Sequence, residues 1–226
     1  MKRTPFFHTV ASIARKDLQV ELRSRELISS MGLFALLSIL VFSFALELNR
    51  IARIEAVSGV LWVTIVFASL LGLNRSMAME RENGGLDALL IAPVNRAAIF
   101  FGKMAGNLVF MLTVAVVLLP VINVLYDISL FRPWLLFTLL LGIVGFATVG
   151  TLLATITVQT RARESLLPIL MLPVALPLLL GALRASASVL NDAPLEQWVA
   201  WPQIMLVLDV IFIILGFLLF EFVIED

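Results

Sequence analysis

Six long apolar stretches alternate with short polar segments along the chain. They cover residues 30–48, 57–73, 105–125, 134–158, 166–183 and 204–220. A helix needs about 20 apolar residues to cross roughly 30 Å of hydrocarbon, and each stretch can do so, in some cases with a tilt. The pattern therefore predicts an all-α integral membrane protein with six transmembrane helices.

Residues 1–28, before the first span, combine many charges with a narrower apolar stripe. Apolar residues recur there at helical spacing, at Val10, Ile13, Ala14, Leu18 and Leu22. This stripe predicts an amphipathic helix that lies along the cytoplasmic membrane surface and enters the first span through an elbow. A soluble charged tail is the alternative interpretation.

Composition supports a membrane protein and excludes several kinds of chemistry. Of the 226 residues, 61% are hydrophobic and 14% are charged, and a soluble core could not hide so much apolar surface. Six spans leave no room for a second domain, so residues 1–226 are expected to form a single transmembrane domain. The 16 basic and 16 acidic residues cancel, which gives no field to attract nucleic acid. Without cysteine, and with one histidine, we expect no catalytic or metal site.

Basic residues are distributed unevenly on the two sides of the spans. The side that holds the N-terminus carries 12 of the 16 lysine and arginine residues, and the other side carries Arg50, Arg53, Arg132 and Arg184. By the positive-inside rule, both termini are expected in the cytoplasm.

The four tryptophans fall at the outer ends of their segments, at Trp62, Trp134, Trp198 and Trp201. This placement is typical of an interfacial aromatic belt. An aromatic platform for a flat macrocycle on the outer face is the alternative. Small residues in spans three and four have the spacing of close helix packing, at Gly102, Gly106, Gly142, Gly145 and Gly150.

The segment 75–103, between the second and third spans, combines a chain break with a short helical pattern. Asn-Gly-Gly at 83–85 interrupts the preceding helix, and residues 86–92 fit a short helix that Pro93 ends. Leucines on one side of this helix suit insertion into a groove of another protein. We therefore predict a cytoplasmic coupling helix between transmembrane helices 2 and 3.

The same segment resembles the cytoplasmic loop of ABC-2-type transporter permeases, in which a coupling helix seats on a separate ATPase. The resemblance rests on Glu-Arg-Glu-Asn-Gly-Gly-Leu-Asp-Ala-Leu-Leu-Ile-Ala-Pro-Val at 80–94, followed by Gly102-Lys103. It implies that eight residues contact or shape the ATPase interface, namely Glu80, Glu82, Gly84, Gly85, Leu86, Asp87, Leu90 and Pro93. Many relatives have Gly-Thr-Leu-Glu where this chain has Gly-Gly-Leu-Asp, which leaves individual contacts open. The chain has no Gly-x-x-x-x-Gly-Lys-Ser/Thr phosphate loop, so a partner must handle ATP.

The fifth span contains Pro168, Pro173 and Pro177, each of which removes a helix hydrogen bond. A kinked or broken fifth helix is expected, with a merely bent structural helix as the alternative. This proline-rich run, the sequence Gly-Val-Leu-Trp at 59–62 and the six spans together resemble the haem exporter protein B family, CcmB, of cytochrome c maturation.

The resemblance to the CcmB family implies a cargo, partners and a location. It implies a permease subunit of the bacterial cytoplasmic (inner) membrane that pairs with a CcmA-like ATPase, beside CcmC-like and CcmD-like membrane proteins. ATP hydrolysis by that partner would drive haem export, or release of the haem-loaded chaperone CcmE on the outer face. Haem is then a possible cargo and not a cofactor bound by this chain. A homodimer and contacts with membrane lipid are also expected.

Asp209 lies inside the sixth span, where an ionisable residue is a functional candidate. A pair with Arg184 is one interpretation, because the two have opposite charges and similar predicted depths. The alternative is that Asp209 reaches interfacial water. The methionines of the spans are expected to pack and not to bind haem iron, at Met104, Met111, Met171 and Met205.

Three classes of function remain. The first is the membrane subunit of an ABC complex for cytochrome c maturation. The second is an ABC-2-type permease that exports another substrate, such as a drug, lipid or glycan. The third is a stand-alone channel or scaffold. The docking segment argues against the third, and only the proline-rich span separates the first two.

Overall fold

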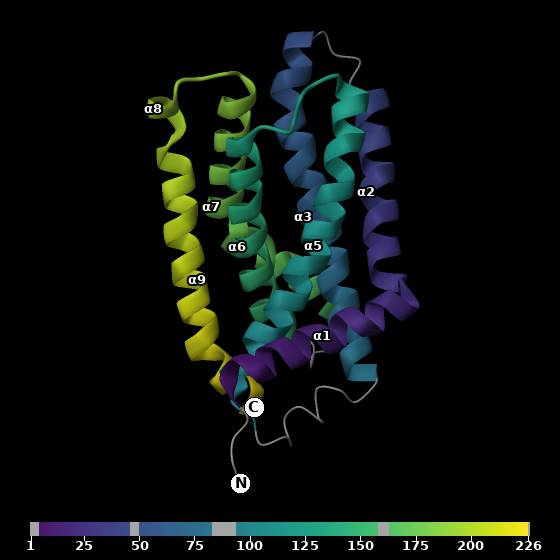
Figure 1. Ribbon diagram of the computed structural model, residues 1–226, viewed down its shortest axis with the longest axis vertical. Coiled ribbons are helices and arrows are strands. Elements are labelled where there is room, and N and C mark those ends of the chain that lie inside the picture. Colours follow the sequence, from purple (N-terminus) through teal and green to yellow (C-terminus); the bar gives the residue numbers. More distant parts are fainter. Residues whose placement is uncertain (1–4, 46–49, 83–93, 158–162, 226) are drawn as a thin grey trace.

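The computed structural model describes residues 5–45, 50–82, 94–157 and 163–225. The helices in chain order are α1 (Phe6–Ser24), α2 (Glu26–Ala45), α3 (Arg50–Glu82), α5 (Arg96–Tyr126), α6 (Pro133–Thr157), α7 (Arg163–Leu190), α8 (Leu195–Trp198) and α9 (Ala200–Glu225). Six long helices run side by side, and α1 crosses the lower end of the bundle (Figure 1).

Within the described ranges, six helices are long and apolar enough to cross a membrane, which confirms the predicted number. Four of them, α3, α5, α7 and α9, are clearly longer than the predicted spans, and the two longest are α3 with 33 residues and α5 with 31. At 1.5 Å per residue these helices are about 50 and 46 Å long, longer than the hydrocarbon layer is thick.

The elbow between α1 and α2 is built from two residues. Arg25 ends α1 in the left-handed conformation, with φ of 55°, and its N–H donates to the Glu21 carbonyl oxygen at 2.7 Å. The side chain of Glu21 then accepts hydrogen bonds from the first backbone N–H groups of α2, from Leu27 at 3.3 Å and from Ile28 at 2.8 Å. A carboxylate there satisfies donors that have no partner within the helix, and it complements the positive end of the helix dipole.

The core of the bundle lies around α3 and α6. About 72% of the α3 span and 67% of the α6 span are buried inside the protein, against 22% for α2. Glycines of α6 allow this packing, because a Cβ atom at Gly142 would collide with the ring of Trp62, and one at Gly150 with the side chain of Leu73. The remaining spans surround this central pair.

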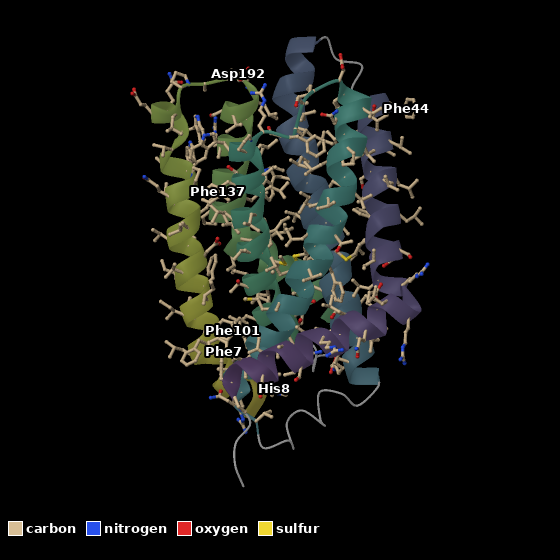
Figure 2. All side chains as sticks on the ribbon, in the orientation of Figure 1. Phe7, His8, Phe44, Phe101, Phe137 and Asp192 are labelled. Atoms are coloured by element: carbon tan, nitrogen blue, oxygen red, sulfur yellow. The ribbon has the colours of Figure 1, made fainter. Side chains whose placement is uncertain are left out.

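The end of the bundle opposite α1 is held by contacts between loops and helix ends. Arg132 donates hydrogen bonds to the Val189 carbonyl oxygen at 2.6 Å and to the Asp192 carboxylate at 2.5 Å. The rings of Trp134 and Trp198 meet edge to face with centroids 5.5 Å apart. Asp192 lies at this end and His8 at the other (Figure 2).

Candidate functional site: an ionic cluster beside the predicted docking segment

The helices α3 and α5 flank the segment in which the coupling helix is predicted. Their facing ends lie at the end of the bundle that α1 crosses (Figure 1). Asn95 starts α5, and its side-chain oxygen accepts a hydrogen bond from the N–H of Ala97 at 2.9 Å. Residues 83–93 lie outside the described part of the chain, and with them Gly84, Gly85, Leu86, Asp87, Leu90 and Pro93. Glu82 is the last residue of α3, and its side chain is also outside that part.

Two of the predicted packing glycines face α1. A Cβ atom at Gly102 would lie 2.7 Å from the Cβ of Ile13 and 3.2 Å from the backbone oxygen of Val10, so only glycine permits this approach of α1 to α5. At Gly106, one turn further along α5, the nearest neighbour is the side chain of Asp17, at an ordinary 3.5 Å. The crossing therefore brings one face of α1, which carries both Ile13 and Asp17, onto α5.

At this crossing, four charged side chains from three helices form an ionic cluster, which consists of Lys16 and Asp17 of α1, Glu80 of α3 and Lys103 of α5. The Lys103 ammonium lies 3.0 Å from Oδ2 of Asp17 and also donates to the carboxylate of Glu80. Lys16 lies 2.7 Å from Oε1 of Glu80 and 3.2 Å from Oδ1 of Asp17. Each carboxylate thus contacts both ammonium groups.

Burial makes these contacts matter energetically. The side chain of Lys103 is only 3% exposed, and that of Lys16 is 44% exposed. Partial burial lowers the pKa of Lys16, but the hydrogen bond to Glu80 and the negative charges of Asp17 and Glu80 outweigh burial and raise that pKa above its usual value. A buried ammonium without a partner would be very costly, so the position of Lys103 depends on the two carboxylates.

The ionic cluster gives Glu80 partners within its own chain. The resemblance to ABC-2-type permeases implied that Glu80 contacts or shapes the ATPase interface, and the structure pairs its carboxylate with two lysines. In this arrangement Glu80 fixes the end of α3 to α1 and α5. Its contribution to an ATPase interface stays a prediction.

Inside the bundle, Trp62 is a core residue, so its assignment to an interfacial belt is wrong. Its side chain is 0% exposed, and its indole N–H donates to the Ser186 hydroxyl at 2.9 Å. The ring fits against Gly142, where a longer side chain would exclude it. This contact joins α3 to α6 and α7 in the interior.

Asp209 is buried between helices and does not pair with Arg184. The residue is 4% exposed, and neither of its carboxyl oxygens has a hydrogen-bond partner. The carboxyl group lies beside Gly145 of α6 and Leu178 of α7, whereas Arg184 is exposed. The expected pair is therefore absent, and the alternative of contact with interfacial water is also wrong, because Asp209 faces the packed interior.

The fifth span is one continuous helix, α7, so it is not broken, and the kink expected at its prolines stays a prediction. All three predicted prolines lie within α7. Pro173 and Pro177 are on its exposed side, and Pro168 is half-buried. A separate stripe packs against the core at Leu167, Met171, Ala175, Leu178, Ala182 and Ala185. The regular spacing of this stripe keeps the helix continuous despite the lost hydrogen bonds.

Candidate ligands for a metal or haem iron are few. Within the described ranges, no group of three or more His, Cys, Asp or Glu side chains could hold a metal ion. Met171 and Met205 are 0% exposed and pack against Gly150 and Gly181, as expected for packing residues. His8 is exposed at the start of α1 (Figure 2).

These features define a multi-pass α-helical membrane protein. Ion pairs between side chains hold its elbow helix against two of the spans. Residues 8–222 match the family described as CcmB protein. The chain therefore belongs to the CcmB family, which confirms the resemblance found in the sequence.

Three relatives illustrate the similarity to this family. Heme exporter protein B of Rhodobacter capsulatus is 35% identical over 133 residues, which cover 58% of this chain and 59% of that protein. Heme exporter protein B of Paracoccus denitrificans is 33% identical over 159 residues, covering 69% of this chain and 72% of that protein. The Pseudomonas aeruginosa protein of the same name is 27% identical over 192 residues, covering 83% and 86%.

Proposed function

We propose that this chain is the membrane permease subunit of a haem export complex. It couples ATP hydrolysis by a separate ATPase subunit to haem export, or to release of a haem-loaded chaperone on the outer face. The observation that carries the proposal is the match of nearly the whole chain to the CcmB family, together with relatives named heme exporter protein B. Cytochrome c maturation is the process that this export would serve.

The ATPase docks on the coupling helix proposed for residues 86–92, through Leu86 and Leu90. A docking element transmits force only if its flanks resist displacement. Lys103 and Glu80 stand near the two flanks of this segment, and the ionic cluster ties both to α1. A push on the docked helix would therefore move the ends of α3 and α5 together with the elbow helix.

Movement at that end reaches the opposite face through α3. The proposed path runs along α3 to Trp62, whose ring contacts Gly142 of α6 and whose N–H group bonds to Ser186 of α7. Displacement of α3 would thus act on the proline-containing helix. Both termini lie in the cytoplasm in this scheme, and the protein resides in the bacterial inner membrane.

The proposed partners are a CcmA-like ATPase, CcmC-like and CcmD-like membrane proteins and the haem chaperone CcmE. A second copy of the chain is a further proposed partner, because an ABC transporter acts through a pair of ATPase subunits, and each subunit needs a docking element. The ATPase supplies nucleotide chemistry, and this chain supplies the docking segment and the membrane path.

Co-purification of the ATPase with this chain, combined with an assay of haem attachment to c-type cytochromes in the same cells, tests the proposal. The variants are Leu86→Asp and Leu90→Asp, which place a charge on the proposed docking side. Leu195→Asp is the matched control, because Leu195 is an exposed leucine of α8, at the end of the bundle opposite α1 (Figure 1).

Loss of both the ATPase and haem attachment in the two variants, with membrane insertion and the control intact, supports the proposal. Retention of the ATPase overturns the docking assignment. Loss of the ATPase with normal cytochrome c maturation instead identifies an ABC-2-type permease that exports another substrate, such as a drug, lipid or glycan.

A further inference from the structure

A cavity of about 360 Å³ lies where α1 turns into α2, against the ends of α3 and α5. Its polar side carries the carboxylates of Asp17, Glu21 and Glu80 and the ammonium of Lys16. Its apolar side includes Val20, Leu27, Met79 and Phe110. The volume falls at the small end of the range for ligand pockets, about 300–1,000 Å³.

The charges around this cavity do not balance. Two ammonium groups, from Lys16 and Lys103, face three carboxylates, from Asp17, Glu21 and Glu80, which leaves a formal charge of minus one. Among the residues that the structure describes, the carboxylate of Glu21 contacts no ammonium group and accepts only from the N–H groups of α2 and the hydroxyl of Ser24. Each carboxylate oxygen can accept more than one hydrogen bond, so the cavity can take one further cationic donor.

The same cavity also offers a positive group to an anion. Lys16 is 44% exposed and lies at the cavity wall, while Lys103 is buried and fully engaged by its two carboxylates. A ligand that fits this pattern has a positively charged group and a negatively charged group a few bonds apart. Next to these groups it needs an apolar part that contacts the cavity wall at Val20 and Leu27.

The position of the cavity in the fold identifies the source of such a ligand. An amphipathic helix that crosses the end of a membrane bundle lies at the depth of the lipid headgroups. Here α1 crosses the end of the bundle (Figure 1), and the cavity is lined by residues on both sides of its junction with the first span, such as Glu21 and Leu27. Val20 of α1 is 46% exposed although apolar, as expected for a wall shared with lipid.

We propose that this cavity binds the headgroup of a zwitterionic aminophospholipid. The primary ammonium is bound by the carboxylates of Glu21 and its neighbours, the phosphate faces Lys16, and the glycerol end contacts Val20 and Leu27. A primary ammonium has three N–H donors, whereas the quaternary ammonium of a choline lipid has none. Buried carboxylates need donors, so ethanolamine lipids are preferred over choline lipids. This inference is independent of the proposed export function.

Native mass spectrometry of the delipidated full-length chain in detergent tests the proposal. Phosphatidylethanolamine, phosphatidylcholine and phosphatidylglycerol with identical acyl chains are added in turn. The wild-type protein is expected to retain one phosphatidylethanolamine, with binding about tenfold tighter than for the choline lipid. Equal retention of the three lipids overturns the proposal without reference to any variant.

Two variants locate the bound lipid. Val20→Trp fills the cavity from its exposed wall, and Leu22→Trp places the same ring on the same helix, where Leu22 is 71% exposed and is not part of the cavity wall. We expect Val20→Trp to reduce phosphatidylethanolamine retention about tenfold and Leu22→Trp to leave it unchanged. Equal retention by both variants, or equal loss from both, shows that the lipid binds elsewhere and overturns the assignment.

Discussion

Replacement of Lys103 by methionine tests the ionic cluster most directly. Methionine keeps an unbranched apolar stem but removes the charge, so Asp17 and Glu80 lose a shared buried partner. The side chains of Lys103, Asp17 and Glu80 are 3%, 11% and 10% exposed, respectively. Removal of one member of a buried ion pair costs about 3–5 kcal/mol. Lys16 still contacts both carboxylates, so we expect the free energy of unfolding to fall by about 2–4 kcal/mol.

The assay is unfolding in mixed micelles by increasing SDS, followed by the circular dichroism of the helices. Arg75→Met is the matched control, because Arg75 pairs with Glu26 at the same end of the molecule but both side chains are more than 40% exposed. Loss of an exposed pair costs about 0–1 kcal/mol. A triple variant, Lys103→Met with Asp17→Asn and Glu80→Gln, removes the uncompensated charges and should recover most of the lost stability.

Two results would refute this reasoning. The first is a loss for Lys103→Met no larger than that for Arg75→Met, which would mean that Lys103 is solvated in the folded protein. The second is a triple variant less stable than Lys103→Met, because uncompensated carboxylates would then not cause the loss. If the triple variant folds well yet fails to support haem attachment while the ATPase still co-purifies, the ionic cluster serves coupling beyond stability.

Other contacts give three further predictions. Ser186→Ala leaves the buried N–H of Trp62 without an acceptor and should lower the free energy of unfolding by about 1–3 kcal/mol; the same SDS titration measures it, and a loss below about 0.5 kcal/mol contradicts the bond. Glu21→Ala removes the acceptor at the start of α2 and should lower the free energy of unfolding by about 1–2 kcal/mol, and Glu21→Gln should lower it less. Thermal unfolding in detergent measures both variants, and equal losses would argue against capping. Gly145→Ala should cost about 1–3 kcal/mol because its Cβ meets the carboxyl of Asp209, and Asp209→Ala in the same chain should relieve part of that loss; strictly additive losses would contradict the contact.

Hydrophobic length and periodicity predicted the architecture well. Apolar runs report how many helices can cross a membrane. The helices α3 and α5 exceed their predicted spans because end segments that contain charged residues, such as Arg96 to Lys103 in α5, remain helical outside the apolar window. Of the two glycines, Gly102 and Gly106, the first lies at a close helix contact as predicted, and the second has only ordinary contacts. Their spacing could not identify α1 as the partner of Gly102, because small residues specify that a helix approaches and not which one.

Polar partners were predicted poorly, for a physical reason. Lys103 is 23 residues from Glu80 and 86 from Asp17, and periodicity carries no information about pairs so distant in sequence. Lys103 did carry a usable signal, a lysine within an otherwise apolar helical stretch beside two packing glycines. For Asp209 and Arg184, opposite charge and similar depth in the membrane suggested a pair. Depth does not determine on which face of its helix each residue lies.

The placement of its polar contacts makes α3 the natural helix for transmission between the two ends of the bundle. Glu80 fixes its lower end to α1 and α5, while Trp62, 18 residues earlier, is bonded to Ser186 and set against α6. Eighteen residues of helix span about 27 Å, most of the hydrocarbon thickness. Apolar side chains of neighbouring helices exchange one contact for another in lipid at little energetic cost, whereas buried polar contacts fix two helices in one position relative to each other. Displacement of the lower end of α3 must therefore either carry α7 with it or break the bond between Trp62 and Ser186.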